Sequence, residues 1–572
     1  LLVVSILVGL MDGLGLAMFL PLLELVADQD TQATSEQMGN LAFILQGLQS
    51  LGLQLTLTVV LLTMLTFFIL KGIAKYVSAY LKVVYQQFFT KKIRIENIDA
   101  LSQYSYAAFV TADAGAIQNT LSGEVQRIVT AFVRYTQMLQ QIVMVLTYAG
   151  LAFLANPQFA LLVFIGGLLS NFLFSVLYRK TKALSRKLVQ SNHGFQGLLI
   201  QQVAFFKYLK ATNLIQDYAL NLKIQVNQIE HEVRKIGILN SIMQGVREPI
   251  MMTIVVAIIL LQINVLGGNL STIILSLLFF YRGLGAVMNL QTSYNKFLSF
   301  SGSLDNMTSF VRDLKAHKEQ NGEKHMEAFS RKIELRQLSF GYQPNDLILR
   351  DINLNLHRNE TLALVGESGS GKTTLMNIFS GLLAPTKGEM LVDGVNSTKL
   401  DMHHLQRRIG YITQEAVIFD DTIFNNVTFW AKKNKTNLSR FWDALEKASI
   451  ADFVRKLPDH EDARLGNNGI NLSGGQKQRI SIARELYKEV DFLFMDEATS
   501  ALDSETEQSI QASIDELKGK YTILIIAHRL STIRNADRVA VFKQGQIEHV
   551  GTYRDLVEKS VSFKKMVELQ EL

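Results

Sequence analysis

Residues 366–373 read Gly366-Glu367-Ser368-Gly369-Ser370-Gly371-Lys372-Thr373, which fits the pattern G-x-x-x-x-G-K-(S/T). The run follows an apolar stretch, Thr361–Val365, that predicts a strand, and it precedes a predicted helix that starts at Thr374. The glycines let backbone N–H groups close around a phosphate, the lysine reaches the β- and γ-phosphates, and the threonine hydroxyl binds Mg²⁺. A chance match in a flexible loop is the alternative, and the flanking strand and helix argue against it. The motif predicts a nucleotide phosphate site.

Two acids follow a second apolar strand farther along the chain. The run Phe492–Met495 leads directly to Asp496 and Glu497. Asp496 is placed to hold Mg²⁺ through water, and Glu497 is placed to polarise the water that attacks in phosphoryl transfer. A pair of acids after a strand is equally typical of a helix N-cap. The presence of the phosphate motif in the same chain favours the catalytic interpretation.

A third motif lies between the first two, at Leu472-Ser473-Gly474-Gly475-Gln476. A serine and two glycines at the start of a predicted helix, Gln476–Tyr487, form an anion-binding helix N-terminus, or simply a capped turn. With this motif, residues 329–572 resemble the nucleotide-binding domain of an ABC transporter, whose signature sequence it matches. The resemblance implies ATP and Mg²⁺ as cofactors and ATP hydrolysis coupled to transport as the activity.

The resemblance also assigns roles to four residues outside these motifs. Tyr342 matches the aromatic residue that stacks on adenine, and Gln414 matches the glutamine that contacts Mg²⁺ and the membrane domain. Asp503 ends the D-loop, Ser500–Asp503, and His528 is the switch histidine. Taken singly, three of these residues also have an interpretation without function: Tyr342 as an exposed aromatic, Gln414 as a solvated loop residue and His528 as a core histidine. The chain departs from the family pattern at Gly466-Asn467-Asn468-Gly469, where a glutamate often precedes the signature.

The composition divides the 572 residues into two unlike parts. Residues 1–310 carry 21 Lys and Arg and 14 Asp and Glu, whereas the remainder carries 36 and 37. The basic excess lies between long apolar runs, which indicates a membrane protein and no nucleic-acid partner. The absence of cysteine excludes disulfides, thiolate metal sites and a cysteine nucleophile. We expect a transmembrane domain over 1–310, a linker over 311–328 and the nucleotide-binding domain over 329–572.

About 20 apolar residues are needed to cross a membrane, and the first domain offers six such stretches. We expect an all-α domain with spans at Leu1–Ala27, Leu55–Lys75, Tyr135–Leu154, Phe159–Tyr178, Pro249–Leu266 and Ser271–Gly285, followed by an α/β P-loop domain. Because the chain begins inside an apolar run, we also expect residues to precede it in the natural protein.

The charges orient these spans. Basic residues concentrate in Lys71–Arg94 and Arg179–Lys210, which places these connections and the nucleotide-binding domain in the cytoplasm and the protein in the inner (plasma) membrane. The connections are predicted to be helices that continue from the membrane. On the outer side, the apolar spacing from Leu41 to Leu51 predicts an amphipathic helix on the membrane surface or an early start of the second span.

A membrane domain fused to a C-terminal ATPase resembles the exporter type of the family. The chain holds one phosphate loop and one signature, and the resemblance places each nucleotide between two subunits, so a dimer is implied. Intact motifs favour a homodimer over a heterodimer. Short stretches near Gln103–Ala114 and Asn213–Asp217 resemble the coupling helices that contact the ATPase.

Charges inside the membrane are candidates for substrate contact because they are costly there. Arg282, Arg247 and Asp12 are our candidates, and Arg282 is suited to a phosphate or pyrophosphate head group. A structural pair between Arg282 and an acid such as Asp12 is the alternative. The first span resembles flippases of lipid-linked oligosaccharides, which favours an amphipathic, anionic substrate. An exporter of peptides or hydrophobic drugs is the second hypothesis, and a nucleotide-gated channel or regulatory subunit is the third.

Overall fold

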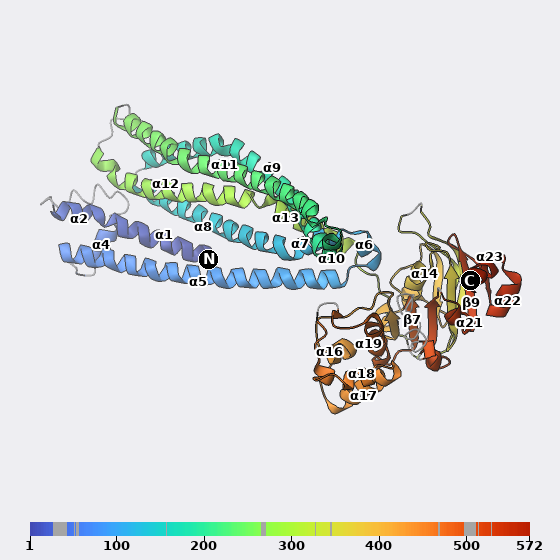
Figure 1. Ribbon diagram of the computed structural model, residues 1–572. Coiled ribbons are helices and arrows are strands. Elements are labelled where there is room, and N and C mark those ends of the chain that lie inside the picture. Colours follow the sequence, from blue (N-terminus) through green and yellow to red (C-terminus); the bar gives the residue numbers. More distant parts are fainter. Residues whose placement is uncertain are drawn as a thin grey trace. The chain divides into compact units, whose positions relative to one another are not determined.

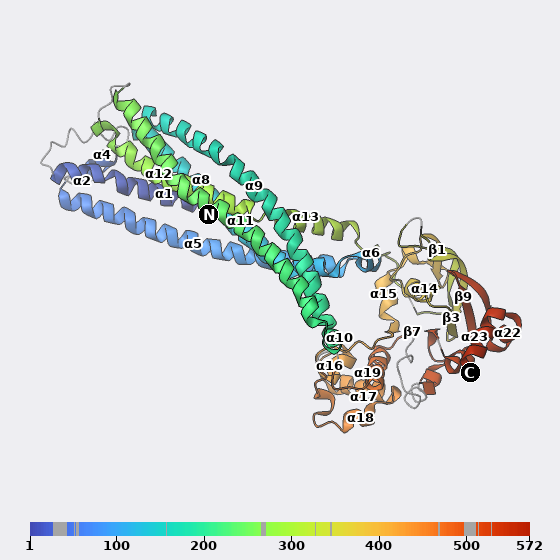
Figure 2. The ribbon, with the colours of Figure 1, turned by 45° about the horizontal axis from the view of Figure 1, so that its top comes forward.

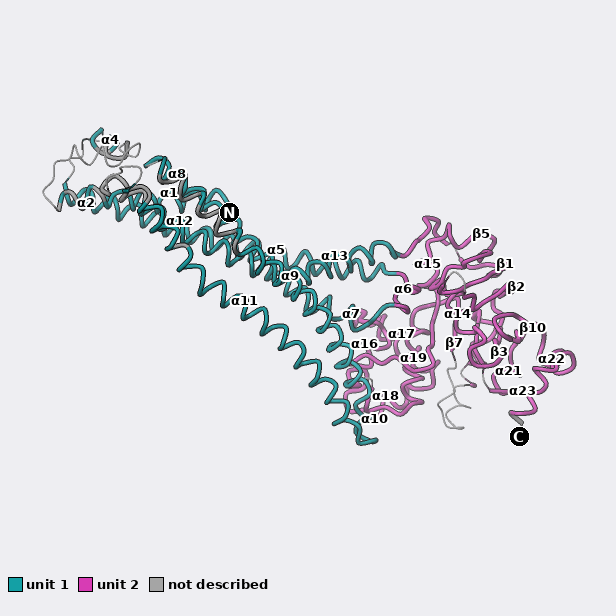
Figure 3. The backbone as a smooth tube through the Cα atoms, turned by 90° about the horizontal axis from the view of Figure 1, so that it is seen from above, with its two compact units in different colours: residues 1–104, 112–318 teal, residues 105–111, 319–572 magenta. Residues whose placement is uncertain are grey.

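The computed structural model describes residues 1–26, 43–50, 52, 56–155, 157–264, 270–326, 328–343, 346–466, 469–496, 511–512, 514–527 and 529–571. They form two compact units. One unit comprises residues 1–104 and 112–318, and the other comprises residues 105–111 and 319–572 (Figure 3). The chain passes between the units after residue 318, inside the segment that the sequence assigns to the linker.

The described part of the first unit is helical (Figure 1). Its α-helices are α1 (Leu2–Ala17), α2 (Phe19–Val26), α4 (Phe43–Ser50), α5 (Leu57–Ser102), α7 (Ala114–Asn119), α8 (Val125–Ala155), α9 (Pro157–Ala204), α10 (Phe206–Ala211), α11 (Ile215–Asn264), α12 (Leu270–Leu298) and α13 (Ser301–Ala316). A short π-helix, Thr120–Glu124, joins α7 to α8.

Three described stretches are long and apolar enough to cross a membrane: Leu57–Ser102, Ala114–Ala155 and Ile215–Leu260. The predicted number of six spans therefore stays a prediction. The first predicted span is divided at Met18, between α1 and α2. As predicted, α5 and α9 continue as helices far beyond their apolar stretches.

The outer helix predicted near Leu41–Leu51 corresponds to α4. This helix ends at Ser50, and α5 begins at Leu57 with Thr56 as its N-cap, so α4 is a separate helix and not an early start of the second span. Leu41 and Leu51 lie outside the described residues.

Apolar packing joins the helices of this unit (Figure 2). α1 packs against α5 and α8, α8 packs against α12, and α9 packs against α11. The core between α1, α5, α8 and α12 contains Leu16, Val60, Tyr148, Leu151 and Phe279. At Gly13 a Cβ atom would lie 2.1 Å from Leu151 Cδ1, so a glycine permits the close approach of α1 to α8.

The second unit contains two β-sheets. The strands are β1 (Lys332–Phe340), β2 (Leu349–His357), β3 (Thr361–Gly366), β4 (Lys387–Val392), β5 (Val395–Asn396), β6 (Ile409–Ile412), β7 (Phe492–Asp496), β8 (Thr522–Ile526), β9 (Arg538–Lys543) and β10 (Gln546–Gly551). β2-β1-β4-β5 form an antiparallel sheet. The six-stranded sheet has the order β10-β9-β3-β8-β7-β6 and is parallel except for β10.

The side chains of the central strands point alternately to the two faces of the six-stranded sheet, and each face is covered by an apolar core. In β3, Ala363 and Val365 join one buried cluster, while Leu362 and Leu364 join the other. Because successive side chains of a strand point to opposite faces, the uninterrupted apolar run of β3 is explained by burial on both sides.

Helices complete the second unit. They are α6 (Tyr106–Thr111), α14 (Lys372–Phe379), α15 (Met402–Arg407), α16 (Ile423–Thr428), α17 (Lys435–Lys447), α18 (Ala451–Arg455), α19 (Gly474–Tyr487), α21 (Leu530–Arg534), α22 (Tyr553–Lys559) and α23 (Val561–Glu571). Strands β3 and β6–β9, with the helices between them, make the predicted α/β nucleotide-binding fold.

Candidate nucleotide-binding site and membrane charges

The phosphate loop connects β3 to α14. Gly366 ends the strand with φ 146°, and a Cβ atom there would lie 2.2 Å from the carbonyl oxygen of Phe542 in β9. Gly371 precedes α14 with φ 101°. These two positions require glycine, since a side chain would clash at the first and strain the backbone at the second. The loop therefore turns sharply and leads into a helix N-terminus, which favours anions.

The loop side chains fit a phosphate ligand. Lys372 is 6 % exposed, and its Nζ donates hydrogen bonds to the carbonyl oxygens of Gly366 and Glu367, both at 2.9 Å. The Ser370 hydroxyl is buried and has no hydrogen-bond partner among the described residues. Glu367, Ser368, Gly369 and Thr373 are exposed, and Thr374 is half-buried. A buried ammonium and a buried hydroxyl are groups that can bind phosphate oxygens.

Asp496 lies level with this loop across the sheet. β8 separates β3 from β7, and its residue Ile526 pairs with both Leu364 of β3 and Asp496 of β7. The carboxyl ends of the parallel strands therefore bring the carboxylate and the phosphate loop to the same edge. This is the edge at which open α/β sheets bind their ligands.

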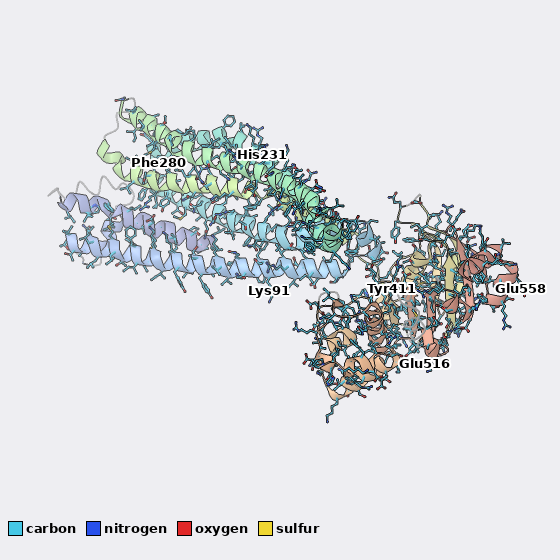
Figure 4. All side chains as sticks on the ribbon, viewed as in Figure 1. Lys91, His231, Phe280, Tyr411, Glu516 and Glu558 are labelled. Carbon is cyan, nitrogen blue, oxygen red and sulfur yellow. The ribbon has the colours of Figure 1, made fainter. Side chains whose placement is uncertain are left out.

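Tyr411 on β6, labelled in Figure 4, connects this edge to α14. Its hydroxyl donates a hydrogen bond of 3.0 Å to Asn377 Oδ1 of α14. Burial, and then the negative charge of Asp496, raises the pKa of Tyr411. The hydroxyl is therefore neutral and remains a donor. Sequence reasoning missed this residue, although its place three residues before Gln414 was visible.

The signature lies at the start of α19. Ser473 is the N-cap, and its hydroxyl accepts a hydrogen bond of 3.3 Å from the Gln476 backbone N–H, while Gln476 Oε1 accepts one of 2.9 Å from the Ser473 N–H. This reciprocal pair is a capping box. Ser473 and Gly474 are exposed, Gly475 is buried, and a Cβ atom at Gly474 would meet no atom within 4 Å. The helix N-terminus is thus open on the side of these residues.

Arg484 fixes the other end of α19 to α16. Its Nε donates to the carbonyl oxygen of Asn426 at 2.6 Å, and its Nη2 donates to Asn426 Oδ1 at 3.1 Å. The guanidinium also lies 5.2 Å from the ring centroid of Phe419. Because Arg484 is 4 % exposed, these contacts replace its water and hold the signature helix in position.

The remaining predicted nucleotide residues divide into described and undescribed ones. Tyr342 follows β1, is half-buried and lies edge-on to Phe340 with centroids 5.1 Å apart. Gln414 follows β6 and is exposed. Glu497, Asp503 and His528 lie outside the described residues, as do Asn467 and Asn468 of the departure before the signature.

Comparison with known proteins agrees with this site. The family model described as ABC transporter matches residues 349–500, and the model described as ABC transporter transmembrane region matches residues 1–289, half of the chain. The chain belongs to the ABC transporter family. It binds ATP and couples ATP hydrolysis to transport, as a multi-pass membrane protein.

Relatives and a solved structure extend the match over most of this transporter. It is 30 % identical over 480 residues to the heterocyst differentiation ATP-binding protein HepA of Nostoc, covering 83 % of this chain and 77 % of that protein. It is 30 % identical over 440 residues to an ATP-dependent lipid A-core flippase of Haemophilus influenzae, covering 74 % and 73 %. The flippase of the same name from Paraburkholderia xenovorans is 28 % identical over 517 residues, covering 88 % and 85 %.

The solved structure of a bacterial Atm1-family ABC exporter with ATP bound is similar in fold. The TM-score is 0.80 at 21 % identity, over 100 % of this chain and 98 % of that one. The transporter therefore has the exporter fold, with a helical membrane domain followed by a nucleotide-binding domain.

Helix α6 of the transporter belongs to the second compact unit. It lies within the predicted coupling stretch Gln103–Ala114, and its Ala107 packs against the apolar cluster of the nucleotide-binding domain. Tyr106 also lies within electrostatic range of Tyr342 and Tyr411. The second short helix is α10, Phe206–Ala211, which precedes the predicted stretch Asn213–Asp217 because α11 already begins at Ile215.

Asp12 has two partners inside the membrane domain. Its carboxylate accepts hydrogen bonds from Lys71 Nζ and from the hydroxyl of Tyr148, one on each oxygen. The three groups come from α1, α5 and α8. Sequence reasoning considered Arg282 as the partner of Asp12 and missed Lys71 and Tyr148. Lys71 stood out only as a basic residue at the end of an apolar run.

The two arginine candidates differ in their surroundings. Arg282 on α12 is exposed and within electrostatic range of Asp12, but no acid of the described residues lies within ion-pair distance of it. Arg247 on α11 is 2 % exposed and donates to the carbonyl oxygen of Met288, at 2.8 Å, and to the hydroxyl of Thr292, both on α12. Arg247 thus joins two helices, although its buried Nε has no hydrogen-bond partner among the described residues. Contact of Arg247 or Arg282 with a substrate stays a prediction.

Proposed function

We propose that this transporter flips an amphipathic, lipid-linked molecule with an anionic head group across the membrane by alternating access. The proposal rests on Arg282. Because Asp12 pairs with Lys71, Arg282 is an exposed cation of the helix bundle, and no acid of the described residues lies within ion-pair distance of it. An arginine in a low-dielectric surrounding binds phosphate or pyrophosphate bidentately. The names of the relatives, which are lipid A-core flippases, support the same class of substrate.

The residues of the nucleotide site suit ATP and Mg²⁺. We infer that Lys372 and the loop Gly366–Thr373 hold the phosphates and that Tyr342 stacks on the adenine. Thr373, Gln414 and Asp496 are the oxygen ligands suited to Mg²⁺. When bound, Mg²⁺ would neutralise charge that develops on the transferred phosphoryl group.

We assign two of the three catalytic roles to residues outside the described part. We infer that Glu497 polarises the attacking water and that His528 orients it, with Lys372 stabilising the transferred phosphoryl group. Asp503 completes the site from the D-loop. These assignments rest on the order of the motifs along the chain.

We infer that two copies of the chain form a homodimer. One chain supplies one phosphate loop and one signature. The Ser473 hydroxyl can still donate a hydrogen bond to a ligand held by a second chain, and the space beside Gly474 leaves room for that ligand. Closure of two such sites around ATP would open the cavity of the membrane domains toward the outside, and hydrolysis would reset it.

We place the transporter in the inner membrane with its nucleotide-binding domain, residues 329–572, in the cytoplasm. The basic stretches that continue from the apolar helices support this orientation, since Lys and Arg concentrate on the cytoplasmic side. The membrane domain then covers residues 1–310, with residues 311–328 as the linker.

ATP hydrolysis by the purified protein in lipid nanodiscs tests the proposal, with a pyrophosphate-linked oligosaccharide lipid, peptides and hydrophobic drugs added separately. Glu497→Gln serves as the blank without hydrolysis. We expect stimulation by the lipid alone, and Arg282→Ala should reduce that stimulation about 10-fold or more, since a charge-assisted hydrogen bond contributes about 1.5–3 kcal/mol. Arg282→Lys is the matched control that keeps the charge and should retain part of the effect.

Stimulation by peptides or drugs only would leave the ATPase in place and overturn the substrate. Equal loss of basal and stimulated hydrolysis in Arg282→Ala would show that Arg282 is structural. Hydrolysis by Glu497→Gln at the wild-type rate would overturn the catalytic assignment.

A further inference from the structure

A cavity of about 390 Å³ lies between α9 and α11, where its lining residues follow the apolar stretch of α9 and precede that of α11. Its size is within the range of small-ligand sites, about 300–1,000 Å³. We call it the basic pocket, because three of its lining residues are lysines: Lys180, Lys187 and Lys235. The wall of the pocket is almost entirely apolar: Leu184, Ile238 and Leu239 line it with their side chains, and the lysines line it mainly with their alkyl chains. His231, labelled in Figure 4, lies on α11 one turn before Lys235.

Among the described residues, one of the three lysines of the basic pocket has an acidic partner and two have none. Lys235 Nζ lies 3.5 Å from Glu232 Oε1, which is a weak pair. Lys180 and Lys187 are exposed and have no acidic partner among the described residues. The sequence contains no Asp or Glu between residues 179 and 216. The pocket therefore carries a net positive charge that an anion would complement.

An exposed apolar track leads from the pocket toward the membrane. On α11, Ile238, Ile242 and Val246 follow one another at intervals of four residues and are 44–49 % exposed. On α9, Val176 and Phe172 continue the face of Lys180 at the same interval and are also exposed. Residues four apart lie on one helix face, so both helices extend the rim of the pocket with apolar surface.

We propose that the basic pocket binds an anionic phospholipid of the cytoplasmic leaflet, with its phosphate among the three lysines and an acyl chain along Ile238, Ile242 and Val246. Basic pockets between membrane helices on the cytoplasmic side suit such head groups. A soluble phosphate would use the lysines but not the apolar track, and an apolar molecule would use the track but not the lysines. Only an anionic lipid satisfies both. The proposal does not rest on the transported substrate proposed above.

Native mass spectrometry of the full-length protein in detergent tests the pocket, with dioleoylphosphatidylglycerol and dioleoylphosphatidylcholine as probes. The double variant Lys180→Gln/Lys187→Gln should weaken the first phosphatidylglycerol binding step about 25-fold, since each lysine near a head group contributes about fivefold. Phosphatidylcholine binding should not change. Raising the salt concentration should weaken phosphatidylglycerol binding to the wild type as well.

The matched control is Arg179→Gln/Lys182→Gln, which removes the same charge from the same helix at residues that do not line the pocket. It should change phosphatidylglycerol binding less than threefold. Ala183→Trp keeps every lysine but fills the space between them, and it should weaken binding as much as the double variant.

Three results would overturn the proposal. Wild-type binding by the double variant would show that the lysines do not hold the lipid. An equal loss in the control would assign the binding to the general charge of α9. Displacement of phosphatidylglycerol by an equal concentration of a pyrophosphate-linked lipid would assign the pocket to the transported molecule. Thermal unfolding of each variant, measured alongside, separates a lost site from a lost fold.

Discussion

Replacing Lys71 by Met should strongly destabilise the membrane domain, because it leaves the carboxylate of Asp12 buried without its countercharge. The side chains of Asp12 and Lys71 are 4 % and 14 % exposed. Without Lys71, Asp12 keeps the neutral hydroxyl of Tyr148 as its hydrogen-bond donor. The surrounding core of Leu16, Leu151 and other apolar side chains offers no hydrogen bond, and Arg282 acts on Asp12 only from beyond ion-pair distance.

The size of the effect follows from this burial. Removing one partner of a buried ion pair costs about 3–5 kcal/mol, whereas replacing both partners by neutral groups is often neutral. We therefore expect Lys71→Met to cost about 4 kcal/mol. Asp12→Asn should cost about 2 kcal/mol, because the more exposed ammonium can reach water. The double variant should cost about 1 kcal/mol or less, so the two changes should couple by about 5 kcal/mol.

Thermal unfolding of the four proteins in the same detergent provides the double-mutant cycle. Basal ATP hydrolysis in nanodiscs provides a second readout, and the double variant should recover both. Costs that add within about 0.5 kcal/mol would refute the pairing. A double variant that is stable but loses lipid-stimulated hydrolysis would instead make Asp12 a substrate residue.

Three further variants test the nucleotide-binding domain. Arg484→Met removes both hydrogen bonds to Asn426 and should lower the free energy of unfolding by about 2–4 kcal/mol, measured as a lower unfolding temperature of the full protein. Arg484→Lys should restore little of this stability. Wild-type stability of either variant would contradict the conclusion that Arg484 holds α19 in position. Burial alone would raise the pKa of Asp393, but hydrogen bonds from the backbone N–H groups of residues 330–332 outweigh it and lower the pKa. The ionised carboxylate therefore stabilises the folded domain at pH values above the ordinary Asp pKa of 3.8. This stabilisation is lost as the pH falls below 3.8 and the carboxylate of the folded protein becomes protonated. Asp393→Asn should therefore cost about 1–3 kcal/mol at neutral pH and progressively less in acid, measured by urea unfolding across pH, and a pH-independent difference would contradict it. Gly366→Ala places a methyl group 2.2 Å from the carbonyl oxygen of Phe542 and should cost about 3 kcal/mol and weaken ATP binding, measured by nucleotide fluorescence; unchanged binding would show that the loop can shift.

The nucleotide site could be predicted from the sequence because its geometry is local. The phosphate loop needs glycines at fixed positions between a strand and a helix, and Gly366 and Gly371 have the backbone conformations that this requires. The capping box of Ser473 and Gln476 is likewise set within four residues. Asp496 could be placed because parallel strands end at one edge. Periodicity also predicted the long helices α5 and α9, although not the break at Met18.

Contacts between distant helices could not be predicted in this way. Asp12 and Lys71 are 59 positions apart, and Asp12 and Tyr148 are 136 apart, so no local pattern joins them. The role of Arg247 depends on a backbone carbonyl of α12, which carries no sequence signal. The turn between α10 and α11 could not be located from the sequence because it contains neither Gly nor Pro, and its left-handed residue is Asn213. The coupling role of the stretch Asn213–Asp217 stays a prediction.

The membership of α6 in the second unit has a consequence for how the molecule can be divided. The segment 105–111 packs with residues 319–572, although more than 200 residues of membrane domain separate them along the chain. No single cleavage of the polypeptide yields both units whole, because three breaks are needed. An isolated ATPase fragment beginning at residue 319 would expose to water the apolar surface that Ala107 covers. The two units therefore alternate along the gene, and an ATPase expressed separately would have to carry residues 105–111 with it.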